Sequence, residues 1–213
     1  MTSPQSPSTP VRSPKRALAQ EIWTAISEGA YRPGEWLRQI DLEQRFAATR
    51  FDVRAALEEL VLRHAIEHVR NRGYRVAETD LETLRAIKAA RVILERATAA
   101  GIVANLDETS LASLAAMATE FGQAVRSGTR ADQSRVNREF HQLLYRLCGN
   151  PILEELIWSL RDRARGAPLS VWASHDSLLR SESDHHEMVE ALRQRDVARL
   201  AALIERHIQK DTP

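Results

Sequence analysis

The sequence predicts a mainly α-helical protein, with a small N-terminal unit of three short helices and a β-hairpin and a larger C-terminal unit of helices alone. Apolar residues recur at helical spacing in the segments before His64. Two short segments with strand character then flank a polar turn at Asn71, which is typical of a hairpin. From Asp80 onward nearly every segment keeps helical spacing and aromatic residues are few. These observations predict two units of different architecture in one chain.

Hydrophobic residues make up 43% of the 213 residues, which is enough to bury the core of one large domain or two modest ones. The formal net charge is only +1, so any affinity for nucleic acid has to come from local groups of basic residues. No apolar run approaches the roughly 20 residues that span a bilayer, and the polar N-terminus lacks the pattern of a signal peptide. The single Cys148 excludes an internal disulfide, fits a reducing compartment and is expected in the core. These features favour a soluble cytoplasmic protein.

Three stretches are expected along the chain: a disordered tail rich in Ser, Thr and Pro over residues 1–14, an N-terminal domain over 15–77 and a helical domain over 80–213. In the N-terminal domain, helices are predicted over 16–28, 39–46 and 50–64, and strands over 65–69 and 73–76. Gly29 is expected to end the first helix, and Thr49 to cap the third. The third helix should bury an apolar stripe of Val53, Ala56, Leu57 and Leu60.

The helical domain is expected to be an antiparallel bundle of about six or seven helices. Helices are predicted over 80–104, 107–127, 130–148, 151–165, 175–195 and 196–210. Glycine and proline mark the breaks at 149–151 and 166–168, and a short turn at 194–196 joins the last two helices.

A candidate DNA-binding surface combines the third helix with the hairpin tip. Arg50 and Arg54 lie off the apolar stripe and one turn apart, and arginine can bond bidentately to the guanine edge in the major groove. Arg72 and Gly73 lie at the hairpin tip, where a basic turn suits the phosphate backbone or the minor groove. Any one of these residues alone is better explained as an ordinary solvated side chain. In this order of elements they predict a winged helix-turn-helix that binds double-stranded DNA.

The same segment resembles the winged helix-turn-helix of GntR-family bacterial transcription regulators. The matching residues are Gly29, Pro33-Gly34-Glu35, Leu37, Leu42, Thr49-Arg50, Val53-Arg54, Ala56-Leu57, Leu60 and Arg72-Gly73. The resemblance implies that the operator is contacted by Arg50, Phe51, Arg54, Asn71, Arg72 and Gly73. Two departures concern the operator sequence: Phe51-Asp52 replaces the usual Thr-Pro, and His64 stands where the family has glycine.

A second constellation comprises Asn137, His141, His185 and His207. Asn137 and His141 are four residues apart and share one helix face. His185 and His207 lie on the two helices of a predicted antiparallel hairpin, which brings them together. Three imidazoles and one side-chain oxygen could bind zinc, nickel or another first-row divalent ion. Taken singly, each histidine is better explained as an ordinary polar residue.

The second constellation lies in a region that resembles the all-helical FCD effector domain of the FadR-like subfamily. The matching segments are Asn137-Arg138-Glu139-Phe140-His141, Gly149-Asn150, Asp184-His185, Ala191-Leu192 and Asp196 to His207. The resemblance implies metal ligands of one Asp and three His, at the positions of Asn137, His141, His185 and His207. Asn137 replaces the acid, which weakens the attraction for a dication. A metal-free pocket, in which the histidines bind an anionic effector directly, is the alternative.

Other residues of the helical domain allow two interpretations each. Arg91 and Glu95 match the first helix of the subfamily's effector domain, and form either an ion pair or an effector site in which Arg91 binds a carboxylate. His186 is the rival of His185, and the register of Ala191-Leu192 favours His185. His175 is expected to be exposed. Trp158 and Trp172 either line the pocket or pack in the core, and core packing is favoured for both.

The resemblance implies a ligand-responsive transcription regulator that is not an enzyme. We expect a homodimeric repressor that is released from a pseudo-palindromic operator by a small carboxylate-bearing metabolite. One alternative is a DNA-binding regulator with a decayed effector pocket. The other is a three-histidine metalloenzyme, which the lack of an HExxH motif and the presence of a DNA-binding unit disfavour.

Overall fold

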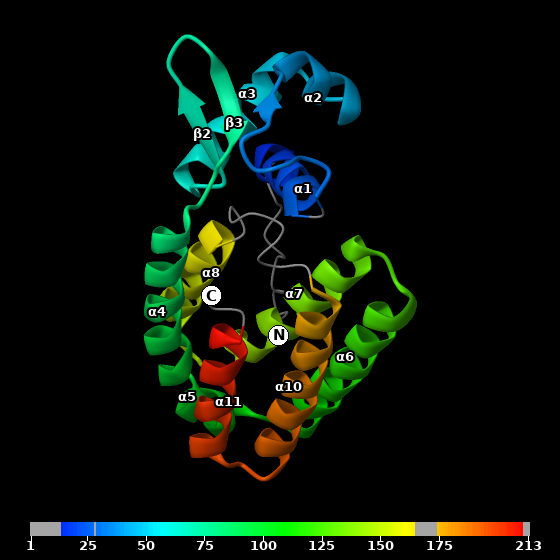
Figure 1. Cartoon of the computed structure of the whole chain (residues 1–213), viewed down its shortest axis with the longest axis vertical. Helices are drawn as coiled ribbons and strands as arrows, with labels where there is room; N and C mark the ends of the chain where they lie inside the picture. The colour runs from blue at the N-terminus through cyan, green and yellow to red at the C-terminus, as the bar shows by residue number, and fades with distance from the viewer. Residues whose placement is uncertain (1–13, 28, 165–173, 211–213) are drawn as a thin grey trace, which may run out of the picture.

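The computed structural model describes residues 14–27, 29–164 and 174–210, and its architecture confirms the predicted fold class. Figure 1 shows a small N-terminal unit with a three-stranded sheet at one end of the long axis and a larger helical unit at the other. Residues 1–13 of the predicted tail, the Gly166–Pro168 loop and Trp172 lie outside the described residues, whereas Pro14 begins the first helix.

The N-terminal unit consists of three helices and three short strands. In chain order they are α1 (Pro14–Ser27), β1 (Trp36–Leu37), α2 (Gln39–Arg45), α3 (Arg50–Leu62), β2 (Ile66–Val69) and β3 (Gly73–Val76). The hydroxyl of Thr49 accepts a hydrogen bond from the amide of Asp52 and so caps α3, as predicted. The predicted apolar stripe of α3 is fully buried against α1 and the sheet.

The sheet has the strand order β1-β3-β2, and both strand pairs are antiparallel. Strand β1 was not predicted, because two residues are too few to show an alternating pattern. At the hairpin tip, Asn71 and Gly73 have φ angles of 62° and 101°. His64 also has a positive φ, 55°, a conformation that glycine adopts without steric cost. A glycine at the position of His64 would therefore fit this conformation without strain.

The helical unit contains seven helices within the described residues, in agreement with the expected bundle. They are α4 (Leu81–Ala97), α5 (Ala99–Asn105), α6 (Glu108–Ser127), α7 (Arg130–Arg146), α8 (Pro151–Ala164), α10 (His175–Arg193) and α11 (Val197–Gln209). The single helix predicted over 80–104 is wrong, because the chain divides at Thr98. The Thr98 hydroxyl donates to the Glu95 carbonyl at 2.6 Å and competes with the regular helical pairing.

Six of these helices form a closed ring around the interior. Going round the ring, α6 packs on α7, α7 on α8, α8 on α4, α4 on α11, α11 on α10, and α10 again on α6. The main apolar core lies within this ring and is built largely from α5, α6, α7, α10 and α11. Side chains that point inward from several helices can therefore meet at one place. No helix in the described part of the chain is both long and apolar enough to cross a membrane.

Candidate functional site

Three histidines from three different helices meet inside the ring. His141 comes from α7, His185 from α10 and His207 from α11, and one ring nitrogen of each lies within 4.8 Å of the others. His141 and His185 are fully buried, and His207 is 8% exposed. The Nε2 atoms of His141 and His207 are 3.2 Å apart. We call these three residues the histidine cluster.

The surroundings of the histidine cluster keep its imidazoles neutral. Burial lowers the pKa of all three well below the usual histidine value. The positive charge of Arg161 adds to this effect on the pKa of His141 and His207, and that of Lys210 on the pKa of His185 and His207. Neutral imidazole is the form that binds a metal ion.

Unpartnered nitrogen atoms make the histidine cluster a candidate ligand site. Among the described residues, both ring nitrogens of His185 and the Nδ1 of His141 are buried without a hydrogen-bond partner. Such atoms are rare in folded proteins because each loses its hydration without compensation. A ligand bound between the rings would remove this cost for the atoms that face it.

The spacing and support of the donors fit a divalent ion. Two nitrogen ligands at about 2.0–2.1 Å from one ion lie roughly 3.0–3.4 Å apart, a range that includes the separation of His141 and His207. Asp184 Oδ2 lies 3.1 Å from His207 Nδ1, so the carboxylate can fix the ring with Nε2 directed at the cluster. Asp184 is itself paired with Arg206 at 2.7 Å.

The remaining candidates occupy different environments. Asn137 lies on α7 one turn before His141, is half-buried and lines the adjoining cavity. Its amide oxygen adds no charge, so the candidate donor set is neutral. His175 is exposed, as predicted. His186 is exposed as well, which agrees with the choice of His185 as the candidate ligand.

A buried charged group lies beside the histidine cluster. Glu95 is fully buried, and its carboxylate is 2.6 Å from the Nε of Arg91 and 2.9 Å from an amino nitrogen of Arg161. The hydroxyl of Tyr145 donates to the same carboxylate, and the ring of Tyr145 stacks on His141 with centroids 5.8 Å apart. The predicted pair of Arg91 and Glu95 therefore exists, but in the interior rather than on the surface.

The charge balance of this group is positive. Burial acts to raise the pKa of Glu95, but the guanidinium groups of Arg91 and Arg161 outweigh it and hold the pKa below its ordinary value. Glu95 is therefore ionised at neutral pH, and it carries one negative charge against two positive ones. Among the described residues, the group of Arg91, Arg161 and Glu95 therefore has a net positive charge.

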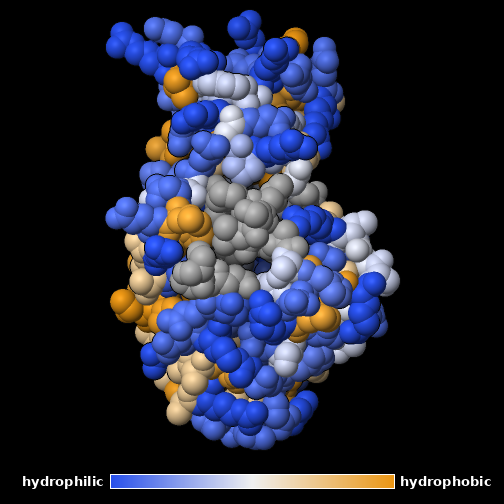
Figure 2. Space-filling view, viewed as in Figure 1, coloured by the Kyte–Doolittle hydropathy of each residue, from blue (hydrophilic) through white to orange (hydrophobic). Residues whose placement is uncertain are grey.

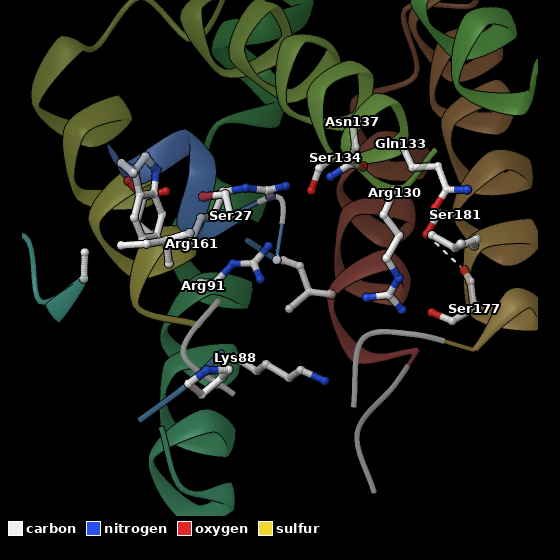
Figure 3. A pocket seen from close by; sticks show the side chains of 18 of the residues that line it. Ser27, Lys88, Arg91, Arg130, Gln133, Ser134, Asn137, Arg161, Ser177 and Ser181 are labelled. Atoms are coloured by element: carbon white, nitrogen blue, oxygen red, sulfur yellow. Dashed lines mark hydrogen bonds between the residues drawn. The ribbon is translucent and has the colours of Figure 1, made fainter. Parts of the chain in front are cut away.

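A cavity of about 240 Å³ adjoins both groups. Arg91, Arg161, Asn137 and His207 lie on its wall, so both groups reach it. Three further cations line the cavity, namely Lys88, Arg130 and Lys210. Figure 3 shows Lys88 and Arg91 of α4 extending toward the same space as Arg130 of α7.

The cavity is bordered by both units. On the described part of its wall the acidic residue is Asp162, which is paired with Arg138 at 3.0 Å. Part of the wall comes from the N-terminal unit, through Trp23, Ile26, Ser27, Gly29, Tyr31, Pro33, His64, Ala65 and Val76. The volume is of the order that holds a small molecule.

Sequence reasoning did not select Arg161, Lys88 or Lys210. No spacing within the chain links Arg161 on α8 to Glu95 on α4, because only the packing of these two helices joins them. Asp184 was part of a motif, but its role beside His207 depends on the contact between α10 and α11.

The candidate DNA-binding residues share one end of the N-terminal unit. Arg50, Phe51 and Arg54 are exposed near the start of α3, and a groove lined by Arg50, Arg54, His68 and Gly73 separates that helix from the hairpin. Figure 2 shows that hydrophilic side chains dominate the visible face of this end of the molecule.

Two details bear on how this surface meets DNA. Asp52 accepts a hydrogen bond from the Thr49 hydroxyl at 2.6 Å, so its charge is engaged in the cap of α3. The guanidinium of Arg72 lies 5.0 Å from the centre of the Trp36 ring, which supports the hairpin tip. The exposed aromatic ring of Phe51 is 68% accessible.

The arrangement defines a winged helix-turn-helix joined to a helical ligand-binding domain. The chain matches the family model for bacterial regulatory proteins of the gntR family over residues 14–76 and the model for the FCD domain over residues 86–210. The chain therefore belongs to the GntR family of transcription regulators and carries an FCD effector-binding domain.

Relatives and solved structures agree with this assignment. The HTH-type transcriptional repressor GlaR of Escherichia coli is 26% identical over 196 residues, which are 88% of this chain and 89% of that protein. An uncharacterized HTH-type regulator of Bacillus subtilis, YdhC, is 25% identical over 64% of this chain, and the match spans only 62% of that relative. The structure of E. coli McbR/YncC is similar with a TM-score of 0.85 and 25% identity, over 94% of this chain and 95% of that one.

Proposed function

We propose that this chain is a repressor that binds a pseudo-palindromic operator as a homodimer and is released from it by a small carboxylate-bearing metabolite. The cation-lined cavity that reaches the histidine cluster is the observation that carries the proposal. The cavity lies in the effector-binding domain of a DNA-binding regulator, where a bound anion can change the affinity of the protein for its operator. The relative GlaR is named a repressor, which supports this direction of regulation.

The effector carboxylate is proposed to bind at Arg91 and Arg161. Both guanidinium groups are held in place by Glu95, at 2.6 Å and 2.9 Å, so little side-chain entropy is lost when a ligand binds. Arginine also offers the bidentate geometry that matches a carboxylate. An anion bound here would neutralise the positive charge of Arg91 and Arg161 that Glu95 does not compensate.

A divalent ion, zinc or nickel, would be held by His141, His185 and His207 with the amide oxygen of Asn137. When bound, it would supply a fixed positive charge that anchors an oxygen of the effector. A metal-free pocket is the second candidate, and one specific observation favours it. The 3.2 Å between the Nε2 atoms of His141 and His207 also suits a hydrogen bond between two neutral imidazoles.

The operator contacts are proposed to come from two elements of each N-terminal unit. Arg50, Phe51 and Arg54 would enter the major groove, and the tip residues Asn71, Arg72 and Gly73 would lie on the backbone or in the minor groove. A two-fold homodimer would place two such units on the half-sites of the operator. The effector would favour the dimer arrangement in which the two recognition helices no longer match the half-site spacing.

A catalytic role for the histidine cluster is not part of the proposal. The acid next to the cluster in sequence, Glu139, is paired with Arg135 at 3.0 Å, and both side chains are largely exposed. It is therefore not placed to act as a general base on a water at the histidines. Asp184 and Glu95 are engaged by Arg206 and by Arg91 with Arg161.

A thermal-shift screen of the purified chain against small organic acids tests the proposal. At least one acid should raise the unfolding temperature of the wild type, because a ligand that binds only the folded state stabilises it. Arg91→Gln should lose this response. Arg96→Gln is the matched control, because Arg96 is on the same helix but pairs with Glu205 at the surface. An acid that stabilises wild type and Arg91→Gln equally would refute the assigned site.

A further inference from the structure

Phe51 points away from the core of the N-terminal unit. The buried side of α3 carries Val53, Ala56, Leu57 and Leu60. At roughly 100° of rotation per residue, Phe51 lies almost opposite the middle of this apolar stripe. Its exposed fraction of 68% agrees with that direction. The aromatic ring therefore lies at the crest of the outward side of α3.

Phe51 lies beside the two arginines that are proposed to contact bases. Arg50 comes directly before it and Arg54 follows three residues later, so the three side chains leave neighbouring sides of α3 near its start. The two arginines also line the groove between α3 and the hairpin. In a helix-turn-helix, the first residues of the helix in the major groove contact the base edges. A docking of α3 that brings both arginines to bases therefore brings the ring of Phe51 to base edges as well.

The chemistry of the ring favours one feature of the major groove. A phenyl ring offers no ordinary hydrogen bond, so polar base atoms covered by it lose water without compensation. The apolar group among the base edges is the C5-methyl group of thymine, and contact with the ring removes apolar surface of both from water. The neighbouring Asp52 could accept from a cytosine amino group, but its carboxylate is engaged by the Thr49 hydroxyl.

We propose that Phe51 selects thymine in each half-site of the operator, through contact of its ring with the C5-methyl group of a base beside those read by Arg50 and Arg54. The inference rests on the proposed function and adds a determinant of the operator sequence. It is a preference that the two arginines do not supply, because arginine pairs with the guanine edge. The methyl group itself is recognised, rather than the hydrogen-bonding pattern of the base.

Replacement of single thymines by uracil tests this contact, because uracil lacks only the methyl group. In vitro selection from random duplexes with the full-length wild type first yields its preferred sequence. Each thymine of that sequence is then replaced in turn by deoxyuridine, and fluorescence anisotropy gives the affinity. At one position of each half-site, uracil should weaken binding of the wild type by about three- to tenfold. At that position Phe51→Ala should bind both duplexes equally, and about as weakly as the wild type binds the uracil duplex.

A second pair of duplexes presents the same methyl group on a different base. With a C·G pair at the sensitive position, the wild type should bind 5-methylcytosine more tightly than cytosine, because the two bases differ only in the methyl group. Phe51→Ala should bind these two duplexes alike. Phe51→Leu keeps an apolar side chain and should retain part of the preference for the methyl group in both pairs of duplexes.

Leu62→Ala is the matched control for loss of an exposed apolar side chain. Leu62 lies on the same outward side of α3, about 16 Å further along the helix from Phe51, and is 81% exposed. Its removal should leave the discrimination between thymine and uracil unchanged. Because neither side chain belongs to the core, thermal unfolding of Phe51→Ala and Leu62→Ala should stay close to that of the wild type.

The outcomes separate the thymine contact from the proposed function. If the wild type selects a sequence, but no uracil replacement distinguishes it from Phe51→Ala, the contact is overturned and operator binding stands. A selected sequence without thymine in its half-sites has the same meaning. If the wild type selects no sequence at all, the thymine contact and the proposed operator binding are both overturned.

Discussion

The arginines of the two units differ in what surrounds them. Arg54 on α3 pairs with Glu58, and these side chains are 69% and 58% exposed. Arg91 and Arg161 share Glu95, and their side chains are 7% and 10% exposed while Glu95 is fully buried. An exposed pair contributes little to stability and exchanges readily for another partner, whereas a buried charge left alone is costly. The same residue type thus suits DNA contact in one unit and a fixed anion site in the other.

The largest effect is expected from removing the buried carboxylate. Glu95→Gln leaves two buried guanidinium groups without their counter-charge, so the free energy of unfolding should fall by about 3–5 kcal/mol. Urea denaturation measures this change. Glu58→Gln is the control for an exposed partner and should stay close to the wild type. A Glu95→Gln protein as stable as the wild type would contradict the claim that the buried arginines, unlike the exposed ones, depend on their counter-charge.

Removing the exposed arginines of α3 should cause a large loss of DNA affinity without a loss of stability. Arg50→Ala combined with Arg54→Ala should weaken operator binding by about a hundredfold or more, because each bidentate base contact contributes roughly 1–3 kcal/mol. A DNA mobility-shift assay gives the affinity, and thermal unfolding shows that the fold is retained. Arg63→Ala, at the other end of α3, should bind DNA nearly as the wild type does. Unchanged binding by the double variant would reject α3 as the recognition helix.

The metal content of the purified protein tests whether the histidine cluster binds a metal ion. His141→Ala and His207→Ala should each lower the metal affinity by about ten- to a hundredfold or more, so most of the metal is lost on dialysis. Elemental analysis of the purified proteins measures it. His186→Ala is the matched control, because His186 is exposed beside the buried His185. Equal metal in all variants and the wild type would refute the ligand set, and Asn137→Asp should bind metal more tightly because it adds a negative charge.

A smaller effect concerns the pH dependence of stability. Burial lowers the pKa of the three histidines in the folded state. Below about pH 6.5 the unfolded chain therefore binds more protons than the folded chain, and the free energy of unfolding decreases as the pH is lowered. Each neutral buried histidine contributes up to about 1.4 kcal/mol per pH unit to this loss. His185→Phe should therefore flatten the slope of the metal-free protein between pH 6.5 and 5 in urea denaturation. An identical slope in both proteins would show that His185 is not held neutral.

Much of the fold followed from the sequence because helical periodicity and turn residues are local signals. The third helix, α3, with its Thr49 cap, the hairpin and the helical bundle were predicted correctly. The two-residue β1 and the break at Thr98 were not, because the first is too short for a pattern and the second depends on one side-chain hydrogen bond.

The candidate site was only partly accessible from the sequence. The spacing of Asn137 and His141 and the pairing of the last two helices anticipated that His141, His185 and His207 meet. The positions of Arg161 and Trp23 at the cavity could not be predicted, because each depends on a neighbour far away in the chain. Arg161 meets Glu95 across two helices, and Trp23 reaches the cavity from the other unit.

Release of DNA by an effector tests the central claim most directly. Fluorescence anisotropy would follow the operator complex of the wild type and of Arg91→Gln while an acid identified by thermal shift is added. We expect the acid to release the wild type from DNA, and Arg91→Gln to bind DNA equally well but to stay bound at the same concentration. Release of both proteins at the same acid concentration, or of neither, would contradict control of the operator through this cavity.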